Sequence, residues 1–361
     1  MAEIILTGGG TGGHLYPALA VAERLQRLAP EVGLLYVGNP ERIEGEVAPA
    51  SGLRFVGVPS AGLSPNPLKS LHALWQTARA FGQLIRVFDR EKPRVVLATG
   101  GYVCAPVLMA CLFKRVPYVL HEQNVYPGKV NRWFARHAKR VATSLPGTEA
   151  YLPAACSERF GNPVRAGVTE QSTQQARRVL GFADDSPLLL VTGGSQGARV
   201  INRAVTTLIP ELLNSTRWSV LFVTGQADHA ATVEALREHC GPRLQIHAFL
   251  QEMPTAIAAC ELAISRAGAT TIAELSAAGR PMILVPYPHA GGHQGLNARA
   301  LVEAGAAVVV DDHDCQVTGL SDTLFPLLRS AESLCSMAEA SRRTGRPEAA
   351  DKLAKLLLSL L

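Results

Sequence analysis

The seven cysteines of this sequence form no recognisable site. They are odd in number and scattered, with no Cys-x-x-Cys pair and no cluster with histidine, so the chain lacks both a disulfide framework and a zinc motif. Charge is also scarce, at 18% of residues against 47% hydrophobic, a balance that excludes a disordered chain. The sequence therefore indicates a globular protein of a reducing compartment, and its 361 residues are enough for two domains.

Long hydrophobic runs are missing too. The longest weakly polar run, residues 104–113, is about half the length of a membrane-spanning helix. Residues 1–6 lead directly into a strand-like run and lack the basic segment of a signal peptide. We therefore expect a cytoplasmic chain with no transmembrane segment.

The charge is distributed unevenly along the chain. Residues 1–160 contain 18 Lys and Arg against 11 Asp and Glu, a net charge of +7, whereas the rest contains 17 against 19, a net charge of −2. A basic first half favours contact of that half with an anionic surface, although chance alone also produces such a split. Nucleic acid is disfavoured as a partner, because no basic run with interleaved aromatic residues is present.

Short β-rich runs alternate with helical stretches throughout the chain. This pattern predicts parallel sheets with crossover helices, and hence an α/β fold. The predicted strands span residues 3–7, 33–37, 94–99, 117–121, 187–192, 219–224, 244–248, 262–265, 282–285 and 306–310. A last helix is predicted from Pro347 onward, with an apolar stripe at Leu353, Leu356, Leu357 and Leu360.

One glycine-rich motif occurs twice. The segment LTGGGTGG at residues 6–13 resembles VTGGSQGA at residues 191–198, and each links a predicted strand to a predicted helix. A shorter version, TGGY, occupies residues 99–102. Two copies of a nucleotide-fold opening predict two Rossmann-like domains, and turn residues at 161–165 mark the linker.

Glycine loops between a strand and a helix direct backbone N–H groups at an anion. Gly8, Gly10 and Gly13 satisfy the GxGxxG pattern of dinucleotide oxidoreductases. That pattern needs an acidic residue at the tip of the second strand, where this chain has Asn39, so a dehydrogenase is disfavoured. Glycine loops in both domains favour a diphosphate donor on one side of a cleft and a phosphorylated acceptor on the other. The alternative is that these loops are only tight turns.

Six motifs carry a resemblance to a known family. They are GGTGGHLYPALA at 9–20, HEQN at 121–124, GNPVR at 161–165, GGSQGA at 193–198, SRAGATTIAE at 265–274 and HQGLNA at 293–298. Together they resemble the MurG family of N-acetylglucosaminyltransferases, which convert lipid I to lipid II in peptidoglycan synthesis. The resemblance implies the GT-B fold, in which two Rossmann-like domains with parallel sheets face each other across a cleft and a C-terminal helix crosses back to the first domain.

The resemblance also implies that the two domains bind different substrates. An acceptor- and membrane-binding domain is expected at residues 1–162, completed by a C-terminal helix at residues 342–361. A domain that binds UDP-N-acetylglucosamine is expected at residues 163–341. The acceptor implied is undecaprenyl-linked lipid I, the third partner is an anionic membrane surface, and the location is the cytoplasmic face of the bacterial inner membrane, to which the protein would bind peripherally.

Several donor-binding residues follow from the family. Glu274 suits the ribose diol, because a carboxylate accepts two hydroxyl hydrogen bonds in parallel, and Ser195 and Arg165 would contact the diphosphate. Gln294 and Asn297 carry amides that both donate and accept, as sugar hydroxyl and N-acetyl groups require. The other donor-binding residues implied are Thr11, Gly12, Gly13, Asn124, Leu250, Ala269, Thr270, Thr271, Ile272 and Ala273. The alternatives are a solvated Glu274, a surface Arg165 and a core position for Leu250.

The candidates for the chemistry are His14, Glu122 and Asn124. His14 can take a proton near neutral pH, and Glu122 is the rival base. The alternative for His14 is that it only orients its glycine loop, and His121 is expected to support the fold. The implied reaction is one in-line displacement at the anomeric carbon, which inverts α to β and releases UDP.

Neither a cofactor nor a metal is expected. Helix N-termini and Arg165 would stabilise the charge on the departing diphosphate. Residues 312–314 spell DHD, a metal motif in other transferases, but no glycine loop lies beside them, so we interpret them as a solvated turn.

A helix predicted near residues 68–88 is apolar on two sides. Leu68 and Trp75 belong to its first apolar face, and Lys69, Arg79 and Arg86 are interspersed. Apolar tips ringed by basic groups suit peripheral docking on anionic lipid. The alternative is a helix packed in the core beside a solvated basic face.

Other functions remain open from the sequence. Another GT-B enzyme, such as a glycolipid glycosyltransferase or a UDP-sugar epimerase, would share the donor site. An epimerase would need no lipid-docking surface. A non-catalytic nucleotide-sugar binding protein would retain Glu274 and Ser195 but would need neither His14 nor Asn124.

Overall fold

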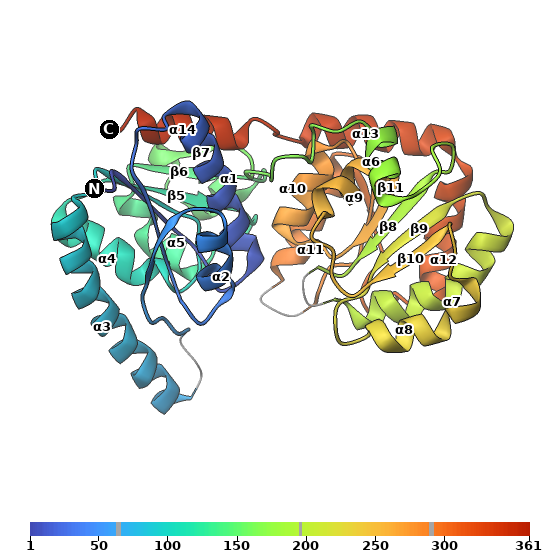
Figure 1. Cartoon of the computed structure of the whole chain (residues 1–361), viewed down its shortest axis with the longest axis horizontal. Helices are drawn as coiled ribbons and strands as arrows, with labels where there is room; N and C mark the ends of the chain where they lie inside the picture. Colours follow the sequence, from blue (N-terminus) through green and yellow to red (C-terminus); the bar gives the residue numbers. More distant parts are fainter. Residues whose placement is uncertain (63–65, 195–196, 289–291) are drawn as a thin grey trace. The chain divides into compact units, whose positions relative to one another are not determined.

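The computed structural model describes residues 1–62, 66–194, 197–288 and 292–361, with the backbone alone for residues 67–69 and 154. The chain divides into two compact units (Figure 1). The first comprises Met1–Val164 and Pro347–Leu361, and the second Arg165–Arg346. The boundary predicted after residue 162 lies just before this division.

The first unit is built on a parallel sheet, which in the described residues has the strand order β3-β2-β1-β4-β5-β6-β7. Its strands are β1 (Ile4–Thr7), β2 (Leu34–Gly38), β3 (Arg54–Gly57), β4 (Val95–Ala98), β5 (Tyr118–Glu122), β6 (Arg140–Thr143) and β7 (Ser157–Arg159). The direction of strand order reverses between β1 and β4. The loops that follow these two strands are therefore neighbours, at the place where parallel α/β sheets bind ligands.

Helices cover both faces of this sheet. They are α1 (Gly12–Leu28), α2 (Ile43–Ala50), α3 (Pro67–Glu91), α4 (Cys104–Lys114), α5 (Lys129–Phe134) and α14 (Ala349–Leu358). Because strand side chains alternate between faces, Ile4 packs in a core with α1 and α14, whereas Ile5 packs in a core with α3 and α4. The helix α14 lies beside α1 (Figure 1) and buries Leu353 and Leu357.

The C-terminal helix predicted at residues 342–361 is two helices in the structure. The helix α13 (Ala331–Thr344) belongs to the second unit, and α14 begins only at Ala349 in the first. Gly345 follows α13 directly, and Pro347 lacks the N–H that a continuous helix would need. The break therefore falls where the chain returns from one unit to the other.

The second unit repeats the architecture. Its parallel sheet has the order β10-β9-β8-β11-β12-β13 over the described residues. The strands are β8 (Leu188–Thr192), β9 (Ser219–Val223), β10 (Leu244–His247), β11 (Leu262–Ser265), β12 (Met282–Leu284) and β13 (Ala307–Val309). The order reverses between β8 and β11, so the loop after β8 and the helix after β11 meet at the second ligand-binding position.

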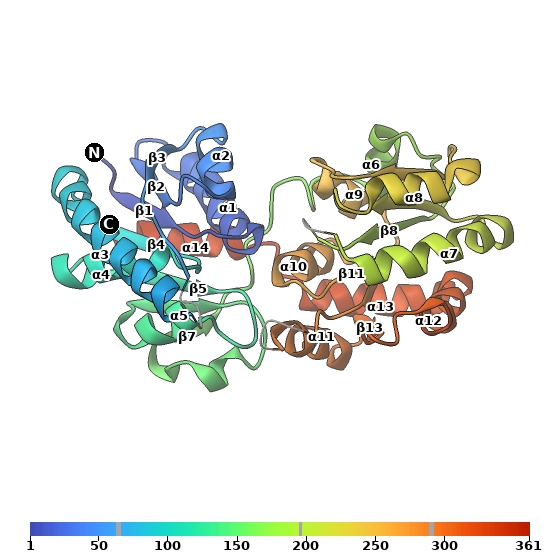
Figure 2. The ribbon, with the colours of Figure 1, turned by 90° about the horizontal axis from the view of Figure 1, so that it is seen from below.

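Helices again pack on both faces (Figure 2). They are α6 (Thr173–Leu180), α7 (Arg199–Ser215), α8 (His229–Ala235), α9 (Met253–Ala259), α10 (Ala269–Ala277), α11 (His293–Glu303), α12 (Val317–Arg329) and α13. One core joins α7 and α12 to the sheet, through Ile201 and Leu324 against strand residues such as Phe222. All of the predicted strands are confirmed to within one residue at either end. The strands β3, β6 and β7 were not predicted.

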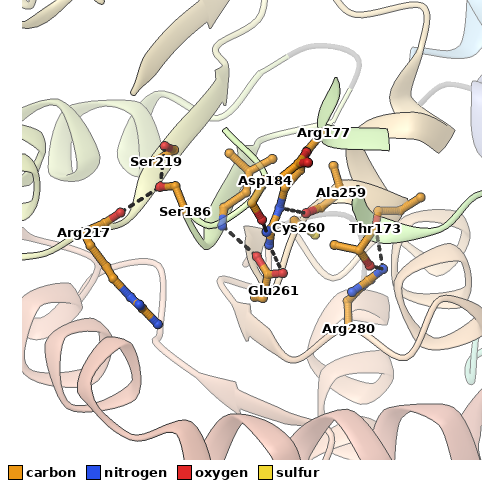
Figure 3. Close-up of polar contacts among 12 residues, drawn as sticks. Thr173, Arg177, Asp184, Ser186, Arg217, Ser219, Ala259, Cys260, Glu261 and Arg280 are labelled. Atoms are coloured by element: carbon orange, nitrogen blue, oxygen red, sulfur yellow. Dashed lines mark hydrogen bonds and ion pairs between the residues drawn. The ribbon is translucent and has the colours of Figure 1, made fainter. Parts of the chain in front are cut away.

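A cluster of ion pairs and hydrogen bonds lies at the N-terminal ends of strands in the second sheet (Figure 3). Arg177 on α6 pairs with Glu261, which directly precedes β11, and donates to the main-chain oxygens of Ala259 (3.2 Å) and Asp184 (2.8 Å). Glu261 accepts the N–H of Leu188 at 2.7 Å. The contacts named here all lie within the second unit. The cluster therefore attaches α6 and α9 to the sheet at the strand ends opposite the glycine loops.

Candidate active site

In the first unit, the loop after β1 lies against the loop after β4. The N–H of Gly9 donates to the main-chain oxygen of Gly100 at 3.2 Å. The backbone at Gly100 has φ +109°, and a Cβ there would lie 2.9 Å from Cδ2 of His14. Only glycine satisfies both conditions. The two loops and the imidazole of His14 therefore form one packed cluster at the reversal of strand order.

His14 has a defined orientation. It is half-buried near the start of α1, and its Nδ1 lies 3.1 Å from the main-chain oxygen of Gly9 and 3.4 Å from Oγ1 of Thr11. Because a carbonyl oxygen only accepts, Nδ1 must carry a hydrogen. In the neutral form of the ring, the lone pair is then on Nε2.

A carboxylate that the sequence did not suggest lies beneath this loop. Glu44 on α2 is fully buried, and its oxygens accept the N–H of Gly10 at 3.0 and 3.2 Å. Its Oε1 also accepts the N–H of Asn39 at 3.2 Å. A Cβ on Gly9 would lie 2.1 Å from that oxygen. The absence of a side chain at Gly9 thus allows the carboxylate of Glu44 to approach the backbone of the loop.

Glu122, the rival base, is buried at the end of β5 and holds the loop that follows. Its Oε1 accepts the N–H of Asn124 at 3.0 Å and the side-chain amide of Asn124 at 3.3 Å. Its Oε2 accepts the N–H of Gly128 at 3.0 Å and the side-chain amide of Asn131 at 2.8 Å. A carboxylate with four donors is suited to positioning Asn124, and this favours His14 as the base.

His121 has no access to solvent. Its Nε2 lies 3.0 Å from the main-chain oxygen of Gly161, and its Nδ1 accepts from the amide of Gln123 at 3.0 Å. Burial lowers the pKa of His121 to about 4, so the ring is neutral near pH 7. It joins β5 to residue 161, in line with the supporting role expected for it.

In the second unit, the two principal donor-site candidates are paired with each other. Nε of Arg165 lies 2.6 Å from Oε1 of Glu274, and Nη2 lies 2.8 Å from Oε2. Glu274 is buried on α10, whereas the side chain of Arg165 is 24% exposed. A bidentate pair of this kind is strong and directional. The sequence predicted both residues at the site but did not predict that they bind each other.

The remaining donor-site candidates occupy different environments. Asn297 is fully buried and donates to the main-chain oxygen of Ala267 at 3.2 Å, so it fixes the loop that precedes α10. Oε1 of Gln294 accepts the N–H of Tyr287 at 3.0 Å. Leu250 is buried, whereas its neighbour Phe249 is exposed. Ser195 lies outside the described residues.

The predicted glycine-loop and helix-start residues fall at the two reversals of strand order. Thr11 is the exposed N-cap of α1, and Gly12 and Gly13 form its first turn. The helix α10 contains Ala269, Thr270, Thr271, Ile272 and Ala273 and begins after Gly268. Within it the side chain of Ile272 belongs to the core, while Ala269, Thr270, Thr271 and Ala273 are half-buried.

The DHD triplet does not act as a unit. Asp312 pairs with Arg266, whose guanidinium also lies 5.4 Å from the ring centroid of Tyr287. Over the described residues, one group of three side chains, Asp311, His313 and Asp314, brings potential metal-ligand atoms within 4.8 Å of one another, and all three are exposed.

The helix α3 exposes part of its apolar surface. Leu71 and Trp75 are 66% and 57% exposed, and Phe113 on the neighbouring α4 is 66% exposed. The guanidinium of Arg79 lies 5.6 Å from the ring of Trp75, and Arg86 is exposed. The side chains of Leu68 and Lys69 lie outside the described residues. None of the helices in the described part of the chain is long and apolar enough to cross a bilayer.

Comparison with known families gives matches to both units. Residues 4–143 match the glycosyltransferase family 28 N-terminal domain, and residues 188–353 match the glycosyltransferase family 28 C-terminal domain. The chain is also 39% identical, over 99% of its own length and 98% of the relative's, to the UDP-N-acetylglucosamine–N-acetylmuramyl-(pentapeptide) pyrophosphoryl-undecaprenol N-acetylglucosamine transferase of Moorella thermoacetica. A protein of the same name from Listeria welshimeri is 36% identical over 99% of both chains.

Solved structures show the same architecture. MurG of Acinetobacter baumannii is similar with a TM-score of 0.78 and 28% identity, over 99% of this chain and 100% of that one. A UDP-GlcNAc 2-epimerase from Neisseria meningitidis, solved with UDP-GlcNAc, has a TM-score of 0.71 at 14% identity, over 99% and 100% of the two chains. The second likeness shows the fold alone.

Proposed function

The chain belongs to glycosyltransferase family 28, and on that premise we propose that it transfers N-acetylglucosamine from UDP-N-acetylglucosamine to N-acetylmuramyl-(pentapeptide) pyrophosphoryl-undecaprenol. This reaction turns lipid I into lipid II for peptidoglycan synthesis. The observation that carries the proposal is the match over 99% of the chain to relatives of that name. Both reversals of strand order carry polar groups suited to such a reaction.

The donor is proposed to bind to the second unit. The ribose diol would bind Glu274, and the diphosphate would compete with Glu274 for the guanidinium of Arg165, because a phosphate matches the same bidentate geometry. The N-terminus of α10 begins at the reversal of strand order and adds a positive dipole. Gln294 and Asn297 would recognise the sugar or hold the loops that do so.

The acceptor is proposed to react at the first unit. The acceptor's C4 hydroxyl oxygen forms the new bond to the anomeric carbon while the bond from that carbon to the diphosphate oxygen breaks. UDP leaves with the electron pair, and the hydroxyl proton passes to Nε2 of His14. Nδ1–H of His14 remains bonded to Gly9. Asn124, held by Glu122, contacts the sugar.

The first unit is also proposed to dock on the cytoplasmic face of the inner membrane. The supporting observations are the net charge of +7 in residues 1–160 and the exposed apolar side chains of α3 and α4. Sedimentation with anionic vesicles should decrease when Arg79 and Arg86 are changed to Glu, since each basic group near such a surface contributes about 1 kcal/mol. Changing the exposed Arg203 and Arg237 of the second unit to Glu is the control. Equal sedimentation of both variants with the wild type would exclude this docking face.

The central test is a transfer assay. The protein is incubated with labelled UDP-N-acetylglucosamine and a lipid I analogue, and lipid-linked disaccharide is the expected product. Conversion of the donor to its C2 epimer without transfer would identify an epimerase. Donor binding with neither product would identify a binding protein and would overturn the proposal.

A further inference from the structure

One peptide unit connects two titratable side chains in the first unit. The carbonyl of Gly9 accepts from Nδ1 of His14 at 3.1 Å. The N–H of the same peptide, which belongs to Gly10, donates to both oxygens of Glu44 at 3.0 and 3.2 Å. The order of groups is therefore carboxylate, peptide N–H, peptide carbonyl and imidazole, with hydrogen bonds at both ends of one planar amide.

We propose that Glu44 is a positioning residue for the transfer reaction and that it acts on His14 through the Gly9–Gly10 peptide. Glu44 holds the peptide so that its carbonyl fixes the hydrogen of the imidazole on Nδ1. Its negative charge stabilises the imidazolium that forms when Nε2 takes the acceptor's proton. The inference rests on the proposed role of His14 as the base.

The physical basis is the polarisation of the amide. A carboxylate bonded to a peptide N–H increases the negative charge on the carbonyl oxygen of that peptide, and hydrogen bonds in such a chain strengthen one another. The carbonyl then binds the charged ring more strongly than the neutral ring. Glu44 is fully buried, so its charge is poorly screened by solvent. The arrangement resembles the buried aspartate that orients a catalytic histidine, with a peptide inserted between them.

The local structure is built to bring these groups together. A Cβ on Gly9 would lie 2.1 Å from Oε1 of Glu44, and a Cβ on Gly38 would lie 2.6 Å from its Cγ. On the other side of the peptide, a Cβ on Gly100 would lie 3.1 Å from Nε2 of His14. The glycines therefore leave room for the Glu44 carboxylate on one side of the Gly9–Gly10 peptide and for the His14 ring on the other.

Three buried titratable groups near the Glu44–peptide–His14 hydrogen bonds are neutral around pH 7. Burial lowers the pKa of His121 on β5 to about 4 and raises the pKa of Cys104 on α4 to about 12. Burial also raises the pKa of Tyr36 on β2 well above its usual value. Among the described residues no Lys or Arg forms an ion pair with Glu44. The charge of Glu44 is therefore available to act on His14.

The first experiment needs no variant. Nitrogen-15 NMR of the full chain with labelled histidine reports which ring nitrogen carries the hydrogen. His14 should have it on Nδ1, whereas His121, whose Nε2 faces the carbonyl of Gly161, should have it on Nε2 and serves as the internal reference. A neutral His14 with its hydrogen on Nε2 would overturn the inference.

The second experiment compares Glu44→Gln with Glu46→Gln, an exposed neighbour on the same helix. Glu44→Gln should lower kcat about tenfold and leave KM for UDP-N-acetylglucosamine unchanged. The acid limb of its rate–pH profile should move to lower pH, because an imidazolium that has lost a stabilising negative charge releases its proton more readily. Glu46→Gln should behave like the wild type, and Glu44→Asp, which keeps the charge, should keep the acid limb in place.

A double variant separates this inference from the proposed function. In a His14→Gln background, Glu44→Gln should cause no further loss of kcat, because the two residues act as one unit. Full additivity, or an unmoved acid limb in Glu44→Gln, would overturn the role of Glu44 while leaving the transferase assignment intact. If His14→Gln retains wild-type turnover, His14 is not the base and the inference fails with it. If Glu44→Gln does not fold, a hydrogen on Nε2 of His14 or a shifted acid limb in Glu44→Asp would still overturn the inference.

Discussion

The buried carboxylates of the candidate site in the first unit are held by neutral donors, whereas Glu274 of the second unit is held by an arginine. Glu44 and Glu122 accept from backbone N–H groups and asparagine amides. Glu274 is paired with Arg165. In the proposed reaction, the negative charge of the first unit would favour a transient cation on His14. An incoming diphosphate would compete for the arginine of the second unit.

A second comparison lies within the second unit. Arg177–Glu261 and Arg165–Glu274 are both Arg–Glu pairs. The first lies at the N-terminal ends of the strands and the second at their C-terminal ends. The side chain of Arg177 is 7% exposed and its other donors are satisfied by main-chain oxygens. That of Arg165 is 24% exposed. We therefore expect the first pair to contribute mainly to stability and the second to exchange partners when the donor binds.

The largest effect is expected from Arg177→Met. Removing the buried guanidinium takes a donor from the main-chain oxygens of Ala259 and Asp184 and the ionic partner from the partly exposed Glu261. Together these losses should lower the unfolding free energy of the second unit by about 3 to 5 kcal/mol. Trp218 is buried in this unit, and its fluorescence during urea unfolding reports the change when Trp75 and Trp133 are replaced by Phe. Arg178→Met, at an exposed pair with Asp184, is the control. Donor affinity of the folded Arg177→Met protein should be unchanged; a loss there would contradict this expectation.

Acidification should affect the first unit through His121. Its folded pKa of about 4 lies below the ordinary value of 6.5, so the unfolded state binds more protons between these values. This stability is present above pH 6.5 and is lost as the pH falls toward 4, by roughly 3 kcal/mol in total. Hydrogen exchange of β4 and β5 amides over this range measures it. His121→Gln should flatten the slope, and an equally steep slope in that variant would assign it to other groups.

Glu274→Gln should have a smaller effect, on binding. Loss of charge-assisted hydrogen bonds to the ribose should weaken UDP-N-acetylglucosamine binding roughly tenfold, measured by calorimetry. The unfolding free energy should fall less than in Arg177→Met, because water can reach Arg165. Glu303→Gln, at the end of α11, is the matched control. Donor affinity within twofold of the wild type would remove Glu274 from the ribose site.

The smallest effect is expected from metal removal. If Arg165 and the N-terminus of α10 stabilise the leaving diphosphate as proposed, EDTA should change turnover by less than about twofold. Turnover abolished by EDTA and restored by magnesium or manganese would show that a cation, and not the arginine, neutralises the diphosphate. The comparison between the two units would then need another explanation.

Most of the fold could be predicted from the sequence, because buried parallel strands give continuous apolar runs between turn residues. The strands β3 and β7 escaped prediction because they are edge strands without a fully buried side chain. The order of strands was not predicted. It decides which glycine loops become neighbours.

The roles proposed for Glu274 and His14 remain predictions, but both residues were predicted as candidates because a motif carries each of them. Their partners were not. Glu44 lies 34 positions from Gly10, and Arg165 lies 109 positions from Glu274. Contacts over such separations depend on how the sheet is assembled and leave no local pattern. Glu122 illustrates the same limit. Its four hydrogen bonds come from the loop at residues 123–131, and they depend on the path of that loop in the folded structure.

The helix α14 returns to the first unit after the chain has passed through the whole of the second. It fills the core beside α1 with Leu353 and Leu357, both fully buried. During synthesis on the ribosome, residues 1–164 therefore emerge with an apolar face uncovered, and it stays so while residues 165–346 are made and fold. The second unit is complete in sequence before the first can close. A nascent chain arrested near residue 346 should consequently bind a chaperone through the first unit, although that unit was translated earlier.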